Sequence, residues 1–206
     1  MCNAYNVRAS GKQVGEIIND EIRKLRSQLV RRGGPGVVLL GDGGDFRAET
    51  MRWGFDHPKY KLVNNARGDS LPKRRGMWWE PMEEGRRCLV PVASFYEWGE
   101  AVAGVKPAYE FSRPDEELMW VAGLYERTAA GAHYATITTE PTAQVAPFHD
   151  RLLAILEWED GLAFLQGERN EFPPYGGSLR IEPCASPLKR KPPEEKLPPP
   201  AQGELF

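Results

Sequence analysis

From residue 36 onward, glycines, prolines and charged turns divide the sequence into short β-rich runs. Strand-forming residues gather at 36–40, 59–63, 87–98, 107–112, 118–125 and 133–139. Glycine and proline interrupt strands and form the turns between them, so this spacing predicts many short strands. A short helix at 159–167 and a final strand at 178–182 are expected to complete the domain.

One longer helix is expected before these runs, at residues 13–32. Gly33-Gly34-Pro35 would end it, and its apolar residues recur at helical spacing: Val14, Ile17, Ile18, Ile22, Leu25 and Leu29. Many strands with few helices predict an α+β fold. We expect a curved antiparallel sheet or barrel-like core with a few flanking helices.

The length and the charge of the chain limit its class. Its 206 residues predict one domain, or one domain with a tail, and no stretch approaches the ~20 apolar residues of a membrane span. The formal net charge of −2 excludes a generally basic nucleic-acid binder, so any phosphate recognition must come from a local cluster. We expect a monomer without a cofactor.

The three cysteines are widely spaced, at Cys2, Cys88 and Cys184. This spacing predicts neither a disulfide framework nor a zinc site. The N-terminus lacks the basic and then apolar pattern of a signal peptide. We therefore expect a protein of the reducing cytoplasm, with no bound metal and no membrane partner.

The last twenty-one residues, from Ser186, differ in composition from the rest of the chain. They contain six prolines and the charged run 189–191, with few apolar residues before the final Leu205 and Phe206. Such a segment buries too little surface to offset its ordering entropy. The sequence therefore predicts a domain at 1–185 and a disordered proline-rich tail at 186–206.

Cys2 follows the initiator methionine, and this position gives it a chemistry that internal cysteines lack. Methionine aminopeptidase removes Met1 before a small side chain, which leaves an amine and a thiol on adjacent carbons. Their ordinary pKa values, about 7.7–8.0 and about 8.5, leave both partly nucleophilic at neutral pH. Such a 1,2-aminothiol condenses with an aldehyde to an imine, and the sulfur then closes a thiazolidine ring. Chance placement of a cysteine is the alternative, so the interpretation depends on partner residues.

Two further stretches place polar residues in apolar or tightly turned surroundings. Residues 64–69 follow the strand at 60–63, at the point where a strand opens into a loop. Glu97 stands between aromatic residues in 95–98, where burial would raise its pKa toward a range useful for proton transfer. The alternative for Glu97 is the solvent face of an alternating strand.

The chain has three histidines. His149 precedes an apolar run, and both a structural and a catalytic role are open for it. His57 and His133 lie in turn-like or alternating polar settings, so we expect both at the surface.

Six segments, taken together, resemble the SOS-response-associated peptidase (SRAP) family, whose members are also called abasic-site processing proteins. The segments are residues 1–5, 51–55, 65–67, 85–91, 95–98 and 148–151, and they occur in the family's order. The resemblance spans residues 1 to about 167 and implies the family's fold. It also implies a catalytic set of Cys2, Asn65, Glu97 and His149.

The resemblance implies a protein of the DNA-damage (SOS) response that captures abasic sites in single-stranded DNA through Cys2. An abasic site in its open form is an aldehyde, the electrophile that a 1,2-aminothiol captures. Either Glu97 or His149 could supply the acid and the base, and Asn65 could position the amine or a sugar hydroxyl. Autocatalytic removal of Met1 and lyase-type Schiff-base chemistry are implied as well, although ring closure by sulfur would suppress strand cleavage.

Contacts to DNA are also implied by the resemblance. Arg67 matches a family arginine that contacts phosphate, and Arg74 or Arg75 lies where a second one is expected. Trp53 is the first candidate for stacking on bases, with Trp78 and Trp79 as weaker ones. Burial in the core is the alternative for each tryptophan.

The chain departs from the family pattern at three places. Asn3-Ala4 stands where many members have Gly-Arg, so the DNA contact of that arginine is absent or supplied elsewhere. Asp69 replaces a glutamate. The segment 151–153 lacks a common proline, which concerns the strand beside His149.

The C-terminal pentapeptide 202–206 resembles the motif that binds the bacterial sliding clamp, with Gln202, Leu205 and Phe206 as anchors. A noncatalytic clamp adaptor is therefore one alternative function. Another is an N-terminal-nucleophile cysteine amidohydrolase, in which Cys2 attacks an amide and its own α-amine acts as the base. That enzyme would require neither the arginines after Asn65 nor the C-terminal motif.

Overall fold

The structure is a computed structural model that describes residues 2–8, 15–42, 45–74, 76–115 and 117–188. Its centre is a closed barrel, in which five strands pair in the ring β12–β4–β3–β8–β11–β12. The strands are β3 (Pro35–Asp42), β4 (Asp45–Trp53), β8 (Arg87–Val92), β11 (Met119–Thr128) and β12 (Gly131–Thr139). The predicted α+β fold with a barrel-like core is confirmed.

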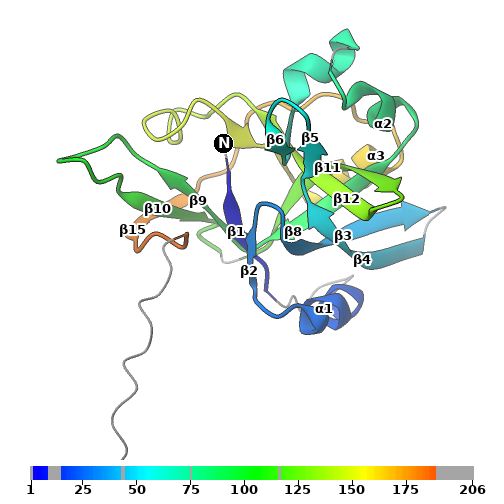
Figure 1. Cartoon of the computed structure of the whole chain (residues 1–206), viewed down its shortest axis with the longest axis horizontal. Coiled ribbons are helices and arrows are strands. Elements are labelled where there is room, and N and C mark those ends of the chain that lie inside the picture. The colour runs from blue at the N-terminus through cyan, green and yellow to red at the C-terminus, as the bar shows by residue number, and fades with distance from the viewer. Residues whose placement is uncertain (1, 9–14, 43–44, 75, 116, 189–206) are drawn as a thin grey trace, which may run out of the picture.

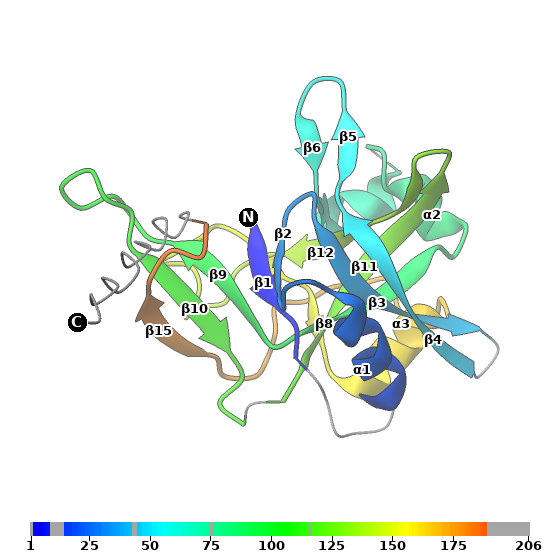
Figure 2. The ribbon, with the colours of Figure 1, turned by 60° about the horizontal axis from the view of Figure 1, so that its bottom comes forward.

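A second, antiparallel sheet lies beside the barrel, in the strand order β15-β10-β9-β1-β2 (Figure 1). Its strands are β1 (Ala4–Asn6), β2 (Leu29–Arg31), β9 (Ser94–Trp98), β10 (Ala108–Ser112) and β15 (Arg180–Cys184). Because β1 pairs with both β9 and β2, the N-terminal segment runs through the interior of this sheet. Figures 1 and 2 place it between the β9–β10 hairpin and the barrel.

Short elements complete the fold. The hairpin of β5 (Phe55–His57) and β6 (Lys61–Val63) projects from the molecule (Figure 2). Strands β7 (Asn65–Arg67), β13 (Leu152–Leu153) and β14 (Ile155–Leu156) extend the barrel sheet. The helices are α1 (Gly15–Lys24), the 3₁₀ helix η1 (Gly68–Lys73), α2 (Trp79–Glu83) and α3 (Trp158–Leu165). Within the described residues, no helix has the length and apolar character needed to cross a membrane.

The core joins the second sheet to the barrel through aromatic side chains. Tyr5 from β1 and Tyr134 from β12 are fully buried, and their hydroxyls hydrogen-bond to each other. Gly36 in β3 leaves room for this pair, because a Cβ there would overlap both hydroxyl oxygens. Any side chain at residue 36 would therefore displace β1, which leads to Cys2.

The long helix predicted at 13–32 is wrong in its extent. Helix α1 ends at Lys24, and residues 29–31 form β2, paired with β1. Ile18 and Ile22 are buried as the helical spacing indicates. Leu29 also fits that spacing, but its backbone pairs with β1, a segment more than twenty residues earlier in the chain. Local periodicity cannot reveal such a distant partner. Val14 lies outside the described residues.

Three other features of the sheets differ from the expectation. The run at 87–98 is two strands, β8 and β9, which belong to different sheets and are separated at Ala93. Strand β4 was not predicted, because charged residues interrupt its sequence; its pairing with β3 along 45–52 stabilises it. β12 also pairs in parallel with β4 and with β7, so the barrel is not purely antiparallel.

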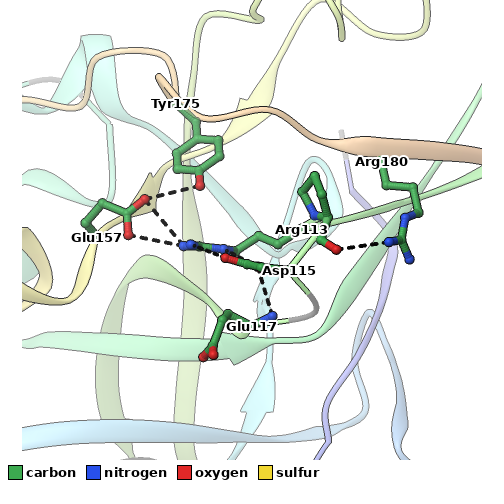
Figure 3. A network of polar contacts seen from close by, with 7 residues as sticks. Arg113, Asp115, Glu117, Glu157, Tyr175 and Arg180 are labelled. Atoms are coloured by element: carbon green, nitrogen blue, oxygen red, sulfur yellow. Dashed lines mark hydrogen bonds and ion pairs between the residues drawn. The ribbon is translucent and has the colours of Figure 1, made fainter.

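An ionic network fastens the outer edge of the second sheet (Figure 3). Arg113, just beyond β10, forms a bidentate pair with Asp115 and reaches Glu157 at 3.1 Å. The Tyr175 hydroxyl donates to Glu157 at 3.2 Å, and Arg180 donates to the Pro114 carbonyl at 2.9 Å. These contacts connect the segment before β15 to Glu157, just after β14 of the barrel sheet, and the start of β15 to the segment after β10. They thereby stabilise the sheet that carries Glu97.

Candidate active site

Cys2 lies two residues before the start of β1 and is 2% exposed in the chain that retains Met1. Its thiol donates to the Ala4 carbonyl oxygen at 3.1 Å. Burial raises the pKa of the thiol well above its usual range, and the negative charge of Glu97 raises it further. In the chain that retains Met1 the thiol is therefore protonated at neutral pH, because the sulfur is desolvated. The partly ionised thiol of the mature chain stays a prediction.

Two side-chain amides hold the backbone of Cys2. Nδ2 of Asn64 and Nδ2 of Asn65 each donate to the Cys2 carbonyl oxygen at 3.1 Å. The Asn65 amide is oriented by Thr136 on β12, whose hydroxyl donates to Oδ1 at 2.7 Å. In this chain, which retains Met1, Asn65 thus contacts the backbone carbonyl of Cys2.

Glu97 is buried on the inner face of β9. Along this strand Ser94 and Tyr96 point to one face, so Phe95 and Glu97 point to the other. Glu97 is 4% exposed, and burial raises its pKa to about 7, an effect to which the charge of Asp150 adds. The predicted desolvation is confirmed, and the solvent-face alternative is excluded.

His149 comes close to this face because Phe148 packs on β10. The Phe148 ring lies 4.6 Å from that of Tyr109 and 5.4 Å from that of Phe111, between ring centroids. Tyr109 is the direct cross-strand neighbour of Glu97. Partial burial lowers the pKa of His149, whose Nδ1 accepts the Arg151 backbone N–H at 3.0 Å. A neutral imidazole can act as a base at neutral pH.

A cavity of about 700 Å³ opens where the N-terminal segment, residues 60–67 and the 149–151 segment meet. Its lining includes Asn3, Arg32, Tyr60, Asn65, Arg67 and His149. The structure thus brings Asn65, Arg67 and His149 to one cavity, and Asn65 connects it to Cys2. The volume is within the range of small-molecule sites.

The predicted phosphate-binding arginines have different environments. The Arg67 side chain is 60% exposed at the cavity, although it pairs with Asp69 at 3.2 Å. Asp69 also binds the buried Arg151, at 2.9 Å. Arg74 is exposed and pairs with Glu83, away from the cavity lining. Arg75 and the clamp-motif residues Gln202, Leu205 and Phe206 lie outside the described residues.

Stacking on Trp53 is not available, because this side chain is fully buried, with its ring 5.0 Å from that of Tyr5. Trp78 is buried against Phe55, and Trp79 is half-buried in α2. Sequence reasoning missed Tyr60, which is 59% exposed and lines the cavity. Its position between two lysines, near the tip of a predicted strand, was the available signal.

One histidine prediction is wrong. His133 is buried near the start of β12, where its Nδ1 lies 3.1 Å from the Gly54 carbonyl oxygen. The alternating polar sequence around it suggested the surface, but pairing of β12 with β4 encloses it. His133 therefore has a structural environment, outside the cavity lining.

Comparison with known proteins identifies the family. The model of the SOS response associated peptidase (SRAP) family matches residues 1–183. The chain belongs to this family. Among its SRAP relatives, abasic site processing protein YoaM of Bacillus subtilis is 29% identical over 157 residues, 70% of this chain and 67% of the relative. Abasic site processing protein YoqW of the same organism is 31% identical over 155 residues, 69% of this chain and 67% of the relative.

Solved structures share the SRAP fold of this chain. A Bordetella bronchiseptica protein matches with a TM-score of 0.69 at 18% identity, over 89% of this chain and all of that one. A Bacteroides thetaiotaomicron protein matches with the same TM-score and identity, over 90% of this chain and 93% of that one. At this identity the likeness is evidence for the fold alone.

Proposed function

We propose that the mature chain, beginning at Cys2, captures abasic sites in single-stranded DNA as a covalent thiazolidine in the cellular response to DNA damage. The observation that carries this proposal is the environment of Cys2, whose carbonyl is held by two amides beside a buried carboxyl of pKa about 7. The names of the Bacillus subtilis relatives, abasic site processing proteins, support the choice of substrate.

The reaction balances without a cofactor. The Cys2 amine adds to the aldehyde carbon of the ring-opened sugar and forms a carbinolamine. Its hydroxyl takes a proton and leaves as water, which gives an imine. The Cys2 sulfur then bonds to the imine carbon and transfers its proton to the nitrogen, directly or through a base, so that a five-membered ring closes.

Glu97 suits the proton transfers of this sequence. In the chain that retains Met1 its pKa is about 7, so near neutral pH both the protonated and the ionised form are populated, and it can donate the proton that releases water and accept one later. His149, kept neutral by burial, is the second base candidate, and it lines the cavity. Arg67 at the same cavity would contact a phosphate of the bound strand.

Removal of Met1 must come first, because an amide nitrogen cannot form an imine. We propose autocatalysis as one route. The Cys2 sulfur attacks the Met1 carbonyl carbon and the peptide C–N bond breaks, so that the Cys2 nitrogen takes up the thiol proton and becomes a free amine while methionine is held as a thioester. Water then cleaves the thioester, which releases methionine and restores the thiol. Methionine aminopeptidase is the other route. Strand cleavage by β-elimination can proceed from the imine, and ring closure by sulfur removes the intermediate on which that lyase reaction depends.

The test is to incubate the purified protein with a single-stranded oligonucleotide that carries one abasic site. We expect a conjugate that survives heating and denaturing electrophoresis without borohydride reduction. Cys2→Ala should abolish it, and so should an uncleavable residue placed before Cys2. Cys184→Ala is the matched control, since Cys184 lies on β15, outside the cavity lining, and this variant should react like the wild type.

A protein that begins at Cys2, as mass spectrometry would establish, and yet yields no conjugate would refute the proposal. An amidohydrolase or a clamp adaptor would behave in this way. Retention of Met1 in every preparation, with no conjugate, would equally contradict it.

A further inference from the structure

Because the chain carries a net negative charge, it needs a local group of positive charges to bind a DNA strand. The cavity lining contains three arginines, Arg32, Arg67 and Arg151. Asp69 pairs with both Arg67 and Arg151, which neutralises part of their charge. By contrast, in the described part of the chain Arg32 has no carboxylate partner. Its positive charge is therefore the least compensated at this cavity.

The backbone of Arg32 is attached to the N-terminal segment. Its N–H donates to the Asn3 carbonyl oxygen at 3.2 Å, one residue from Cys2. Its side chain crosses to the β5–β6 hairpin, where Nη2 donates to the Leu62 carbonyl oxygen at 3.0 Å. A guanidinium has five N–H donors in a planar fork, so most of its donors remain for a bidentate anion.

The neighbouring hairpin is positively charged as well. Lys59 and Lys61 are exposed, and Lys59 Nζ lies 5.3 Å from the centre of the Tyr60 ring. Figures 1 and 2 both place this hairpin above the β2–β3 turn that carries Arg32. The lining also includes the carboxylate of Asp150, which contacts His149.

We propose that Arg32 binds a backbone phosphate of the single strand next to the sugar that Cys2 captures. The inference rests on the proposed function. It assigns to the β2–β3 turn the arginine contact that Asn3-Ala4 lacks. Because Arg32 is bonded to the backbone of Asn3, a phosphate held there would place the adjacent sugar close to Cys2.

The test uses a single-stranded oligonucleotide with a tetrahydrofuran abasic analogue, which has no aldehyde and so separates binding from covalent capture. Its affinity is measured at several salt concentrations for the wild type, Arg32→Gln and Arg31→Gln. Arg31 is the matched control: it is adjacent and exposed, but it donates to the Pro187 carbonyl oxygen and does not line the cavity.

For Arg32→Gln we expect up to about fivefold weaker binding, the upper end for an exposed ion pair. The slope of log affinity against log salt should become shallower by about 0.7, the value for one contact to a single strand. Arg31→Gln should keep the wild-type slope, and so should Arg32→Lys, which retains the charge. An unchanged slope in Arg32→Gln, or an equal loss in Arg31→Gln, would overturn the assignment.

A second measurement separates this inference from the proposed function. Wild type and Arg32→Gln should form the adduct with free 2-deoxyribose, which has no phosphate, at equal rates. Arg32→Gln should be slower with the abasic oligonucleotide. If the wild type forms no adduct with either aldehyde, the capture proposal fails, while the salt slopes still decide the phosphate contact.

Discussion

Replacing Glu97 by glutamine should stabilise the fold above neutral pH while it removes the proposed proton carrier. The side chain is 4% exposed, and burial raises its pKa to about 7 from an ordinary value of 4.5. Glutamine keeps the shape and carries no charge. It therefore removes the cost of burying a carboxylate and leaves the surrounding packing in place.

The sign and the size follow from proton linkage. A carboxyl whose pKa is higher in the folded than in the unfolded chain favours folding at low pH, where both states are protonated. This stability is complete below pH 4.5 and is lost as the pH rises through about 7. At about 1.4 kcal/mol per pH unit between the two pKa values, the loss is about 3 kcal/mol.

Urea unfolding from pH 4.5 to pH 8.5 measures the effect, with the free energy of unfolding extrapolated to water for each protein. We expect wild type and Glu97→Gln to converge at the acid end and the variant to be about 3 kcal/mol more stable at pH 8.5. Glu100→Gln, a change at an exposed glutamate three residues away, is the control and should follow the wild type.

Parallel pH profiles for wild type and Glu97→Gln would refute this reasoning, because they would mean that Glu97 is ionised in the folded protein at no cost. The same samples serve for the capture assay. There, Glu97→Gln should form the abasic-site conjugate more slowly than wild type at pH 7, despite its greater stability.

Four further predictions test other parts of the structure. Asn65→Ala should slow conjugate formation on gels by on the order of tenfold or more and lower the free energy of urea unfolding by about 1–3 kcal/mol. Tyr60→Ala should change the free energy of unfolding by no more than about 0.5 kcal/mol. It should weaken single-strand binding, measured by fluorescence anisotropy, by about 1–3 kcal/mol. By contrast, Trp53→Ala should lower the free energy of unfolding by about 3–5 kcal/mol. Arg87→Ala removes the hydrogen-bond donor of three backbone carbonyls, those of Met82, Phe164 and Arg169. It should lower the free energy of unfolding by at least about 3 kcal/mol in the same assay. Deleting Leu205-Phe206 should abolish recovery of the sliding clamp in a pull-down. An unchanged amount of recovered clamp would contradict the prediction that residues 202–206 bind it.

Local sequence predicted the parts of the fold that depend on neighbouring residues. Turn residues and short β-rich runs located β3, β10, β11, β12, β15 and α3 to within a few residues. The extent of α1 and the existence of β2 and β4 could not be read in this way. The helix ends early because residues 29–31 pair with β1, more than twenty residues before them. Charged residues conceal β4 in the sequence, and its pairing with β3 and β12 stabilises it.

Some features of the candidate site could likewise be predicted from the sequence, and others could not. Removal of Met1 would leave an amine and a thiol on adjacent carbons of Cys2, so the sequence alone predicted that capture of an aldehyde is chemically available. The motif order also pointed to the residues that proved to lie around one cavity, Asn65, Arg67 and His149.

Tertiary structure alone decided which side chains are buried and which are available. Glu97 and Trp53 each had two open interpretations in the sequence, and the folded chain buries both. Only the fold revealed that Asn64 and Asn65 hold the Cys2 carbonyl and that Arg32 lies beside Asn3. The physical reason is that desolvation and hydrogen-bond partners depend on residues tens of positions away, which meet only when the barrel and the second sheet close around β1.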